Sequence, residues 1–419
     1  MIGESLQLIR LSAQSLIWQA VFCLNLERGA EAHQLLQKAQ QVLDHSQFDP
    51  ESLVNERIFW FVILAWSTNL QHNPEASVNY YQQAFELSRN ANVKHPIFFK
   101  FHWRFLMSGS VSKELYIAIE KDFEAVKQAG NPFELGCVLF VLGMAELFHT
   151  FRIEKAEPLL KESIQKFQLV DDRSTQDMIL KILSYLLLVQ GKFEECLSVK
   201  QRELLVVKDI GDPLQIGIVT AEIGEVLYHQ GKYTEAEAEI HTGMELLKDQ
   251  SEGEYIFRHL YLGNALLAQE KFEQALDAYE TSYRFFQSID EKGWMFTSLT
   301  GLSRTEFALG DRPSAWLHAR QAIQLYSEIQ LYSFFVYLTL ANIALLLVDR
   351  GEILKGLELY YFTTKQAYLA QSRWFADLFG KFFEDASARL SVEEQDLVKE
   401  NGLGMDFLET MDLLQKYLS

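Results

Sequence analysis

The sequence contains little proline, glycine or cysteine for its length. Seven prolines and 22 glycines are spread over 419 residues, and no stretch rich in Pro, Gly or Ser marks a flexible linker. Composition alone therefore gives no domain boundary. The three cysteines, Cys23, Cys137 and Cys196, lie far apart and form no Cys-x-x-Cys pair. This usage argues against a disulfide framework or a cysteine zinc site, and it predicts a reducing, cytoplasmic location.

Positive charge is scarce as well. The 38 Lys and Arg residues stand against 57 Asp and Glu residues, which gives a formal net charge of −19. Because a nucleic-acid surface needs clustered Lys and Arg, we expect no direct nucleic-acid partner. An acidic excess favours basic partners, though only weakly.

No charged residue occurs from Leu331 to Val348, and this stretch has the length of a membrane-spanning helix. It contains Thr339 and Asn342, however, and it falls in the register of the repeat described below. We interpret it as a buried helix. The N-terminus also lacks the basic start of a signal peptide. We therefore expect no membrane partner.

Sequence motifs for catalysis are absent too. There is no His-Glu-x-x-His motif, no Gly-x-Ser-x-Gly elbow and no Cys in a recognisable nucleophile setting. His102 and His149 adjoin phenylalanines and are interpreted as partly buried side chains. We predict a non-enzymatic protein with no catalytic residue, no cofactor and no metal.

What the sequence does contain is an internal repeat. Two adjacent segments, beginning at Gly224 and Gly263, both place an aromatic residue at +9, Ala at +12, a large apolar residue at +16 and a small residue at +19. Small residues at these points let two helices cross closely, and bulky ones fill the space alongside. Nine anchor positions extend the frame along the chain, at separations of 38 to 45 residues: Ala20, Ala65, Leu106, Met144, Ser184, Gly224, Gly263, Ser303 and Ala344.

Turn residues recur in the same phase, 13 or 14 residues before several anchors. They are Gly130-Asn131-Pro132, Asp171-Asp172, Gly211-Asp212-Pro213 and Asp290 through Gly293. Gly and Asn end helices, and Pro cannot continue one. Each repeat is therefore predicted to be a helix A, a short Gly-containing turn, a helix B and a longer link. The fold class is all-α: a right-handed α-solenoid superhelix of about nine helix pairs with a period near 40.

The small-Gly-aromatic-Ala pattern resembles the tetratricopeptide repeat, and the 40-residue variant resembles the sensor region of signal-transduction ATPases with numerous domains (STAND), including maltose-regulator-like activators. The tail is similar too, in Trp374-Phe375-x4-Gly380, Leu390-Ser391-x-Glu393 and Gly402-x3-Asp406. The family's Gly-x4-Gly-Lys-Ser/Thr nucleotide loop is missing from this sequence. The resemblance implies a sensor region, with residues 1–373 as the repeat array and residues 374–419 as its C-terminal helical cap.

The resemblance also implies that helix A lines a concave groove. The residue after each anchor should then face the groove, together with residues one turn away. The candidate groove residues are Lys181, Tyr185, Glu225, Tyr228, Asn264, Thr300, Arg304, Phe307 and Asn342. Aromatic residues elsewhere, in 98–105 and in the pairs Phe285-Phe286 and Phe334-Phe335, are interpreted as core.

Two functions remain open on this basis. The first is a non-catalytic sensor whose groove binds a peptide, a protein segment or a small effector. The alternative is a constitutive protein–protein interaction scaffold with no effector. Neither the ligand nor the oligomeric state follows from the sequence.

Overall fold

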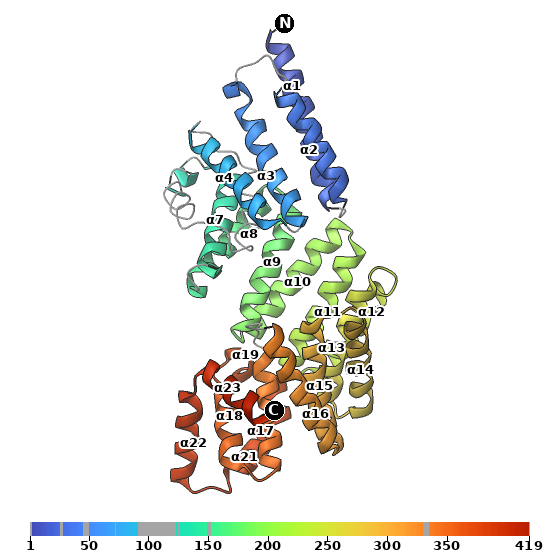
Figure 1. Ribbon diagram of the computed structural model, residues 1–419, viewed down its shortest axis with the longest axis vertical. Helices are drawn as coiled ribbons and strands as arrows, with labels where there is room; N and C mark the ends of the chain where they lie inside the picture. The colour runs from blue at the N-terminus through green and yellow to red at the C-terminus, as the bar shows by residue number, and fades with distance from the viewer. Residues whose placement is uncertain are drawn as a thin grey trace. The chain divides into compact units, whose positions relative to one another are not determined.

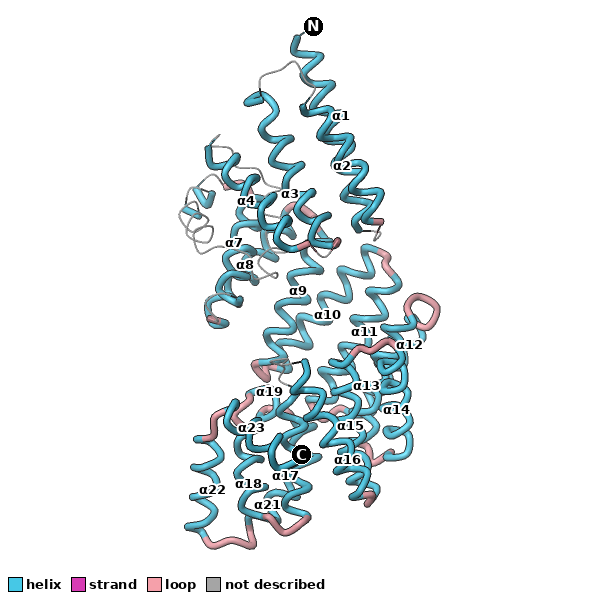
Figure 2. Tube along the Cα trace, viewed as in Figure 1, coloured by secondary structure: helices cyan, strands magenta, loops and turns pink. Residues whose placement is uncertain are grey.

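The computed structural model describes residues 2–25, 28–44, 50–71, 73–90, 123–124, 126–128, 130–148, 152–329 and 335–418. Every regular element within these ranges is helical, and short loops join most of the helices (Figure 2). The chain divides into two compact units, Met1–Thr175 and Gln176–Ser419. Each unit is described by itself.

The first unit consists of antiparallel helix pairs. Its elements are α1 (Ile2–Asn25), α2 (Gly29–Asp44), the 3-10 turn η1 (Pro50–Leu53), α3 (Val54–Leu70), α4 (Pro74–Asn90), α7 (Pro132–Phe148) and α8 (Ile153–Leu169). The closest packing is within the pairs α1–α2, α3–α4 and α7–α8. The stripe of α2 that is buried consists of Ala32, Leu36, Ala39 and Leu43, at the three- and four-residue steps of an amphipathic helix.

The second unit continues the pattern through five further pairs. Its paired helices are α9 (Arg173–Val189, which begins at the unit boundary), α10 (Phe193–Ile210), α11 (Pro213–His229), α12 (Tyr233–Leu247), α13 (Glu252–Ala268), α14 (Phe272–Ser288), α15 (Lys292–Leu309), α16 (Arg312–Ile329), α17 (Phe335–Asp349) and α18 (Ile353–Thr363). Pairs α11–α12, α13–α14 and α15–α16 follow one another in Figure 1, because each helix also packs on the first helix of the next pair.

The predicted anchors are confirmed wherever the structure describes them. Ala20, Ala65, Met144, Ser184, Gly224, Gly263, Ser303 and Ala344 are all buried, each on the first helix of a pair. The ninth anchor, Leu106, lies outside the described residues. The reason for a small residue is plain at Gly224, where a Cβ atom would lie 2.5 Å from Ile240 Cγ1 and 2.8 Å from the Ala236 carbonyl oxygen.

The predicted turns are also confirmed, but the predicted longer link between repeats is wrong for the repeats between residues 153 and 329. Left-handed backbone (positive φ) occurs at Gly130, Asp171, Gly191, Gly211, Gly231, Glu270, Asp290, Gly310 and Gly351. Between residues 153 and 329, turns and links alike contain only two to four residues. The period near 40 arises because helices α9 to α16 are 15 to 18 residues long.

The tail forms short helices that pack on the array of the second unit. They are α19 (Ala367–Ala370), α20 (Arg373–Phe375), the π-helical turn η2 (Ala376–Gly380), α21 (Lys381–Ser387), α22 (Val392–Gly404) and α23 (Phe407–Leu418). Helix α22 packs on α18, α21 on α17 and α18, α23 on α16, and α20 on α11. Ser391 and Glu394 form a reciprocal capping box that fixes the start of α22.

Candidate functional site

A cavity of about 460 Å³ opens along the first helices of successive pairs in the second unit. We call it the groove cavity. Its lining residues are Lys181, Ser184, Tyr185 and Leu188 of α9, Cys196 and Lys200 of α10, Glu222, Glu225 and Val226 of α11, Phe257 and Tyr261 of α13, Trp294 of α15 and Phe335 of α17. Because it draws mainly on helix A of each pair, it lies where the repeat frame places ligand-facing residues.

Five aromatic side chains form one side of this cavity, which we call the aromatic wall: Tyr185, Phe257, Tyr261, Trp294 and Phe335. The ring centroid of Phe257 lies 4.4 Å from that of Trp294 and 5.3 Å from that of Tyr261. Tyr185 leaves 53% of its surface exposed, and the other four are half-buried. Aromatic rings fixed in this way offer contact area at little entropic cost.

Sequence reasoning missed most of this wall. Trp294 and Phe335 each lie nine residues before the anchor of their repeat, Ser303 and Ala344, and that recurrence was the available signal; Phe257 lies six residues before Gly263 and does not share it. Phe335 was interpreted as core, but it lines the cavity instead. Phe286 is buried as predicted, Phe285 is only half-buried, and Phe334 lies outside the described residues.

The floor of the groove cavity is polar: Lys200 and Glu222 line it, and Glu203 and Arg258 lie behind them as their partners. Lys200, 8% exposed, donates to Glu203 Oε2 at 2.8 Å and to Glu222 Oε2 at 2.7 Å. Arg258, 2% exposed, donates to Glu254 Oε2 at 2.7 Å and lies against the rings of Phe257 and Tyr261. Buried ions need such partners, since removing one member leaves an uncompensated charge.

Burial and charge shift the pKa values of these groups in different directions. Burial alone would lower the pKa of Lys200, but the carboxylates of Glu222 and Glu203 outweigh it and raise that pKa. Burial raises the pKa of Glu225 to about 7, and the charge of Glu222 adds to the effect. Glu222 shows the opposite shift, because Lys200 and Arg258 overcome its burial and lower its pKa. Burial likewise raises the pKa of Glu203 to about 7, but Glu203 is bonded to Lys200, whereas Glu225 is not in an ion pair with any described residue.

Three of the predicted groove residues line the groove cavity. Lys181 donates to Asp177 Oδ2 at 2.8 Å and to Gln215 Oε1 at 2.7 Å. Tyr185 stands at its exposed edge, and Glu225 lies at its base with 8% of its surface exposed. These residues come from α9 and α11, as the repeat frame predicts.

Four other predicted residues lie beneath the chain's own residues 367–383, which we call the return segment. Tyr228 packs against Trp374, with ring centroids 5.6 Å apart, and Trp374 Nε1 donates to the backbone oxygen of Asn264 at 2.9 Å. Arg304 donates to the carbonyl oxygen of Leu378 at 2.7 Å. Phe307 meets the ring of Phe382 edge-on. This part of the A-helix face is covered from within the chain.

His229, at the end of α11, is hydrogen-bonded to two residues of the return segment. Its Nδ1 lies 2.8 Å from Ser372 Oγ and its Nε2 lies 2.7 Å from the hydroxyl of Tyr368. Burial lowers the pKa of His229 to about 3, so the ring is neutral at physiological pH and both nitrogens are satisfied by hydroxyl groups. The return segment is thus part of the packed core of this unit.

The last two predicted residues are buried between helices. Asn342 Nδ2 donates to the backbone oxygen of Thr300 at 2.8 Å, and Thr300 Oγ1 lies 2.6 Å from Thr339 Oγ1. Both Thr300 and Asn342 are 2% exposed. They join α15 to α17, and their side chains do not line the groove cavity. The polar residues of the uncharged stretch 335–348 therefore serve helix packing.

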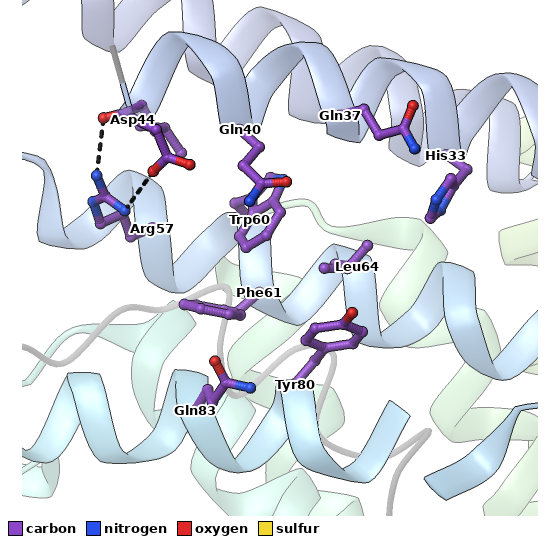
Figure 3. A pocket seen from close by; sticks show the side chains of 11 residues that line it. His33, Gln37, Gln40, Asp44, Arg57, Trp60, Phe61, Leu64, Tyr80 and Gln83 are labelled. Atoms are coloured by element: carbon purple, nitrogen blue, oxygen red, sulfur yellow. Dashed lines mark hydrogen bonds and ion pairs between the residues drawn. The ribbon is translucent and has the colours of Figure 1, made fainter. Parts of the chain in front are cut away.

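A second cavity, of about 410 Å³, lies in the first unit between α2, α3 and α4. Figure 3 shows Gln37 and Gln40 of α2 facing Tyr80 and Gln83 of α4 across a floor that contains Trp60. Arg57 is already bound to Asp44 and to the Leu43 carbonyl oxygen. This cavity is uncharged overall and lacks the paired ionic floor of the groove cavity.

In the part of the chain that the structure describes, no group of three or more His, Cys, Asp or Glu side chains could hold a metal ion. No described helix has the length and apolar content to span a membrane. Residues 98–105 with His102, and His149, lie outside the described residues.

Comparison with known proteins supports the repeat assignment. A tetratricopeptide repeat family model matches residues 255–328. No curated protein matches. Together with the eight described helix pairs, the match shows that the fold is an all-α solenoid of tetratricopeptide type.

Solved structures share this fold at low identity. The apo quorum sensor NprR from B. thuringiensis is 12% identical, with a TM-score of 0.54 over 75% of this chain and 88% of that one. A Rap protein complexed with competence and sporulation factor is 12% identical, with a TM-score of 0.52 over 91% and 100%. A STAND protein with a tetratricopeptide repeat sensor from Pyrococcus horikoshii is 17% identical, with a TM-score of 0.45 over 88% and 54%.

Proposed function

We propose that this chain is a non-catalytic binding module that recognises a peptide or protein segment in the groove cavity. The observation that carries the proposal is the cavity itself: an aromatic wall above a floor of paired charges, on the helices that face the ligand in such repeats. Its shape is set before a ligand arrives, because Lys200 and Arg258 are already fixed by carboxylates. A preorganised site loses little entropy on binding.

The structural likenesses are consistent with this function. The Rap structure is described as a complex with competence and sporulation factor, and NprR as a quorum sensor. At 12% identity these likenesses establish the fold, and the transfer of a ligand class from them is part of the proposal. We further propose a role in signalling, with the array as the sensor region of a STAND-type, maltose-regulator-like protein. This step rests on the turn and tail motifs.

The alternative, a constitutive scaffold, has one observation in its favour. The return segment fills the part of the A-helix face that carries Asn264, Arg304 and Phe307, which leaves less of the groove open to an effector. A scaffold of this kind would bind partners through other surfaces. We also propose that residues 374–419 cap the array of residues 1–373, since the end of a repeat array needs its apolar face covered.

The proposal is tested with an array of randomised hexapeptides and the purified full chain. The double variant Y261A/W294A removes two rings of the aromatic wall. We expect it to weaken binding of the best peptides at least about tenfold, as for an aromatic residue at the centre of an interface.

The matched control is W316A, which removes a half-buried tryptophan from α16, away from the cavity. It should leave affinity unchanged. Peptide binding that survives Y261A/W294A, or no binding of any peptide by the wild type, would contradict the proposal and favour the scaffold.

A further inference from the structure

The charges around the groove cavity do not balance. Lys181 is held by Asp177, and Arg258 by Glu254, each within 2.8 Å. Lys200 contacts two carboxylates, those of Glu203 and Glu222. These three cations are therefore already engaged by four carboxylates, and a fifth carboxyl group borders the cavity.

That carboxylate is Glu225. Tyr261, which also lines the cavity, lowers the pKa of Glu225, but burial outweighs this effect. Among the described residues, no Lys, Arg or His lies within ion-pair distance of it. Lys200 and Arg258 act on it only through space, and each is engaged elsewhere. Burial and the negative charge of Glu222 raise its pKa to about 7. A carboxyl group in this state gains a strong partner when a cation enters.

The aromatic wall suits a cation for a separate reason. The faces of aromatic rings carry negative potential, and they attract guanidinium and ammonium groups, the more so where water is excluded. The protein already uses this attraction, since the guanidinium carbon of Arg258 lies 4.7 Å from the ring centroid of Phe257 and 5.2 Å from that of Tyr261. Trp294 and Tyr185, at the cavity edge, offer further ring surface.

An anionic group fits this cavity less well. It would meet the carboxylates of Glu222 and Glu225, and the two lysines that line the cavity would have to leave the partners they hold at 2.7 to 2.8 Å. Breaking a buried pair leaves an uncompensated charge, which is costly.

We infer that the groove cavity binds a positively charged side chain, Arg or Lys, of a peptide or protein segment, with Glu225 as its counter-ion and the aromatic wall around its stem. This inference rests on the proposed function and specifies its ligand. The specificity-determining residue is Glu225, and Tyr261 contributes ring surface to the same cavity. The net charge of the whole chain, −19, also attracts positively charged segments, and it does so over a longer range.

The test uses four families of N-acetylated hexapeptides that are randomised except at position three, where they carry Arg, Lys, Gln or Glu. Binding is measured at pH 8, where Glu225 is ionised. We expect the Arg and Lys families to bind the wild type at least about tenfold more tightly than the Gln and Glu families, the usual scale for a charge-assisted contact. The variant E225Q, which keeps the shape of the side chain, should abolish that preference.

Two further variants complete the design. E245Q makes the same charge change on the exposed face of α12 and should keep the preference. Y261F retains the ring of the aromatic wall, and it should therefore keep overall binding. Thermal melts of all variants confirm that each is folded.

The outcomes separate the two claims. If peptides bind through the aromatic wall but without preference for Arg or Lys, or if Glu is preferred, this inference is overturned and the proposed function stands. If E225Q keeps the preference, Glu225 is not the counter-ion. If no family binds at all, the proposed function fails and the inference fails with it.

Discussion

Glu225 and Glu203 are carboxyl groups that the fold keeps partly protonated near neutral pH. Burial raises the pKa of each to about 7, with the charge of Glu222 adding to the effect at Glu225 and Lys200 opposing it at Glu203. Other charged or titratable groups face them from the surrounding helices: Lys181 and Tyr185 of α9, Lys200 of α10, Glu222 and Tyr228 of α11, Arg258 and Tyr261 of α13, and Tyr368 of α19.

These shifts predict how stability depends on pH. A carboxyl group with a raised pKa binds more protons in the folded state than in the unfolded state between about pH 4.5 and pH 7, so the free energy of unfolding falls as pH rises through that window. For Glu225 the upper bound is about 3 kcal/mol. We expect E225Q to be less sensitive to pH than the wild type in denaturant titrations at pH 5 and pH 8. Equal pH dependence in E225Q, wild type and the E245Q control would contradict the assignment.

Gly224 is the clearest case of a residue dictated by packing. An added methyl group would lie 2.5 Å from Ile240 Cγ1 and 2.8 Å from a backbone oxygen. We expect G224A to lower the free energy of unfolding by roughly 1–3 kcal/mol, the range for an overpacked core. The control is G253A, also within a helix, where no atom lies within 4 Å of the added Cβ. It should be neutral or stabilising by up to about 1 kcal/mol. Equal effects of the two substitutions would contradict the close helix crossing.

The sequence predicted some of the site residues and missed others for physical reasons. Lys181, Tyr185 and Glu225 follow from the repeat frame, because they lie on the sides of α9 and α11 that line the groove cavity. Thr300 occupies an equivalent phase, but its hydroxyl is bonded to Thr339 of the following A helix. Whether a polar side chain faces a cavity or another helix depends on contacts distant in sequence.

At the scale of elements, periodicity and turn chemistry predicted the helices well. The left-handed turns at Gly191, Gly231, Gly310 and Gly351 fall at glycines, as the turn chemistry of the sequence predicts. Glu270 holds the same conformation, with φ of 60°, at the equivalent point of its repeat. Here the repeat geometry overrides the preference of the residue, which no local pattern reveals. The links were predicted to be longer than they are, because helices of 17 or 18 residues make up most of each repeat.

The return segment was not predicted. The large aromatic side chains of Tyr368 and Trp374 are compatible with a helical cap. Their hydrogen-bond partners, however, lie about 110 to 140 positions earlier in the chain. Contacts at such separations depend on how successive repeats stack, and a single sequence does not encode that stacking in any local pattern.

The return segment should behave as core. Trp374 is 3% exposed, packs on Tyr228 and His229, and donates to the backbone of Asn264. We expect W374A to lower the free energy of unfolding by about 3–5 kcal/mol, as for other buried aromatic residues. W294A, which removes a half-buried ring of the aromatic wall, should cost less than half as much. Chemical denaturation measures both. Similar small losses would show that the return segment is only loosely attached.

For the whole molecule, the repeat count was largely predictable and the division into units was not. Eight of the nine predicted helix pairs fall within the described residues, and each of them is confirmed. The boundary between the two compact units falls after Thr175 in the sequence, within the repeat array, and the composition does not change there.

The central claim is that the groove cavity is where this module binds its partner. Hydrogen exchange with mass spectrometry, with and without the best Arg-containing hexapeptide, tests it directly, because binding protects amides in the elements it stabilises. We predict that protection appears in α9, α11 and α13 and is lost in Y261A/W294A. Protection confined to α2, α3 and α4, or no protection in α11 and α13 at saturating peptide, would contradict the account.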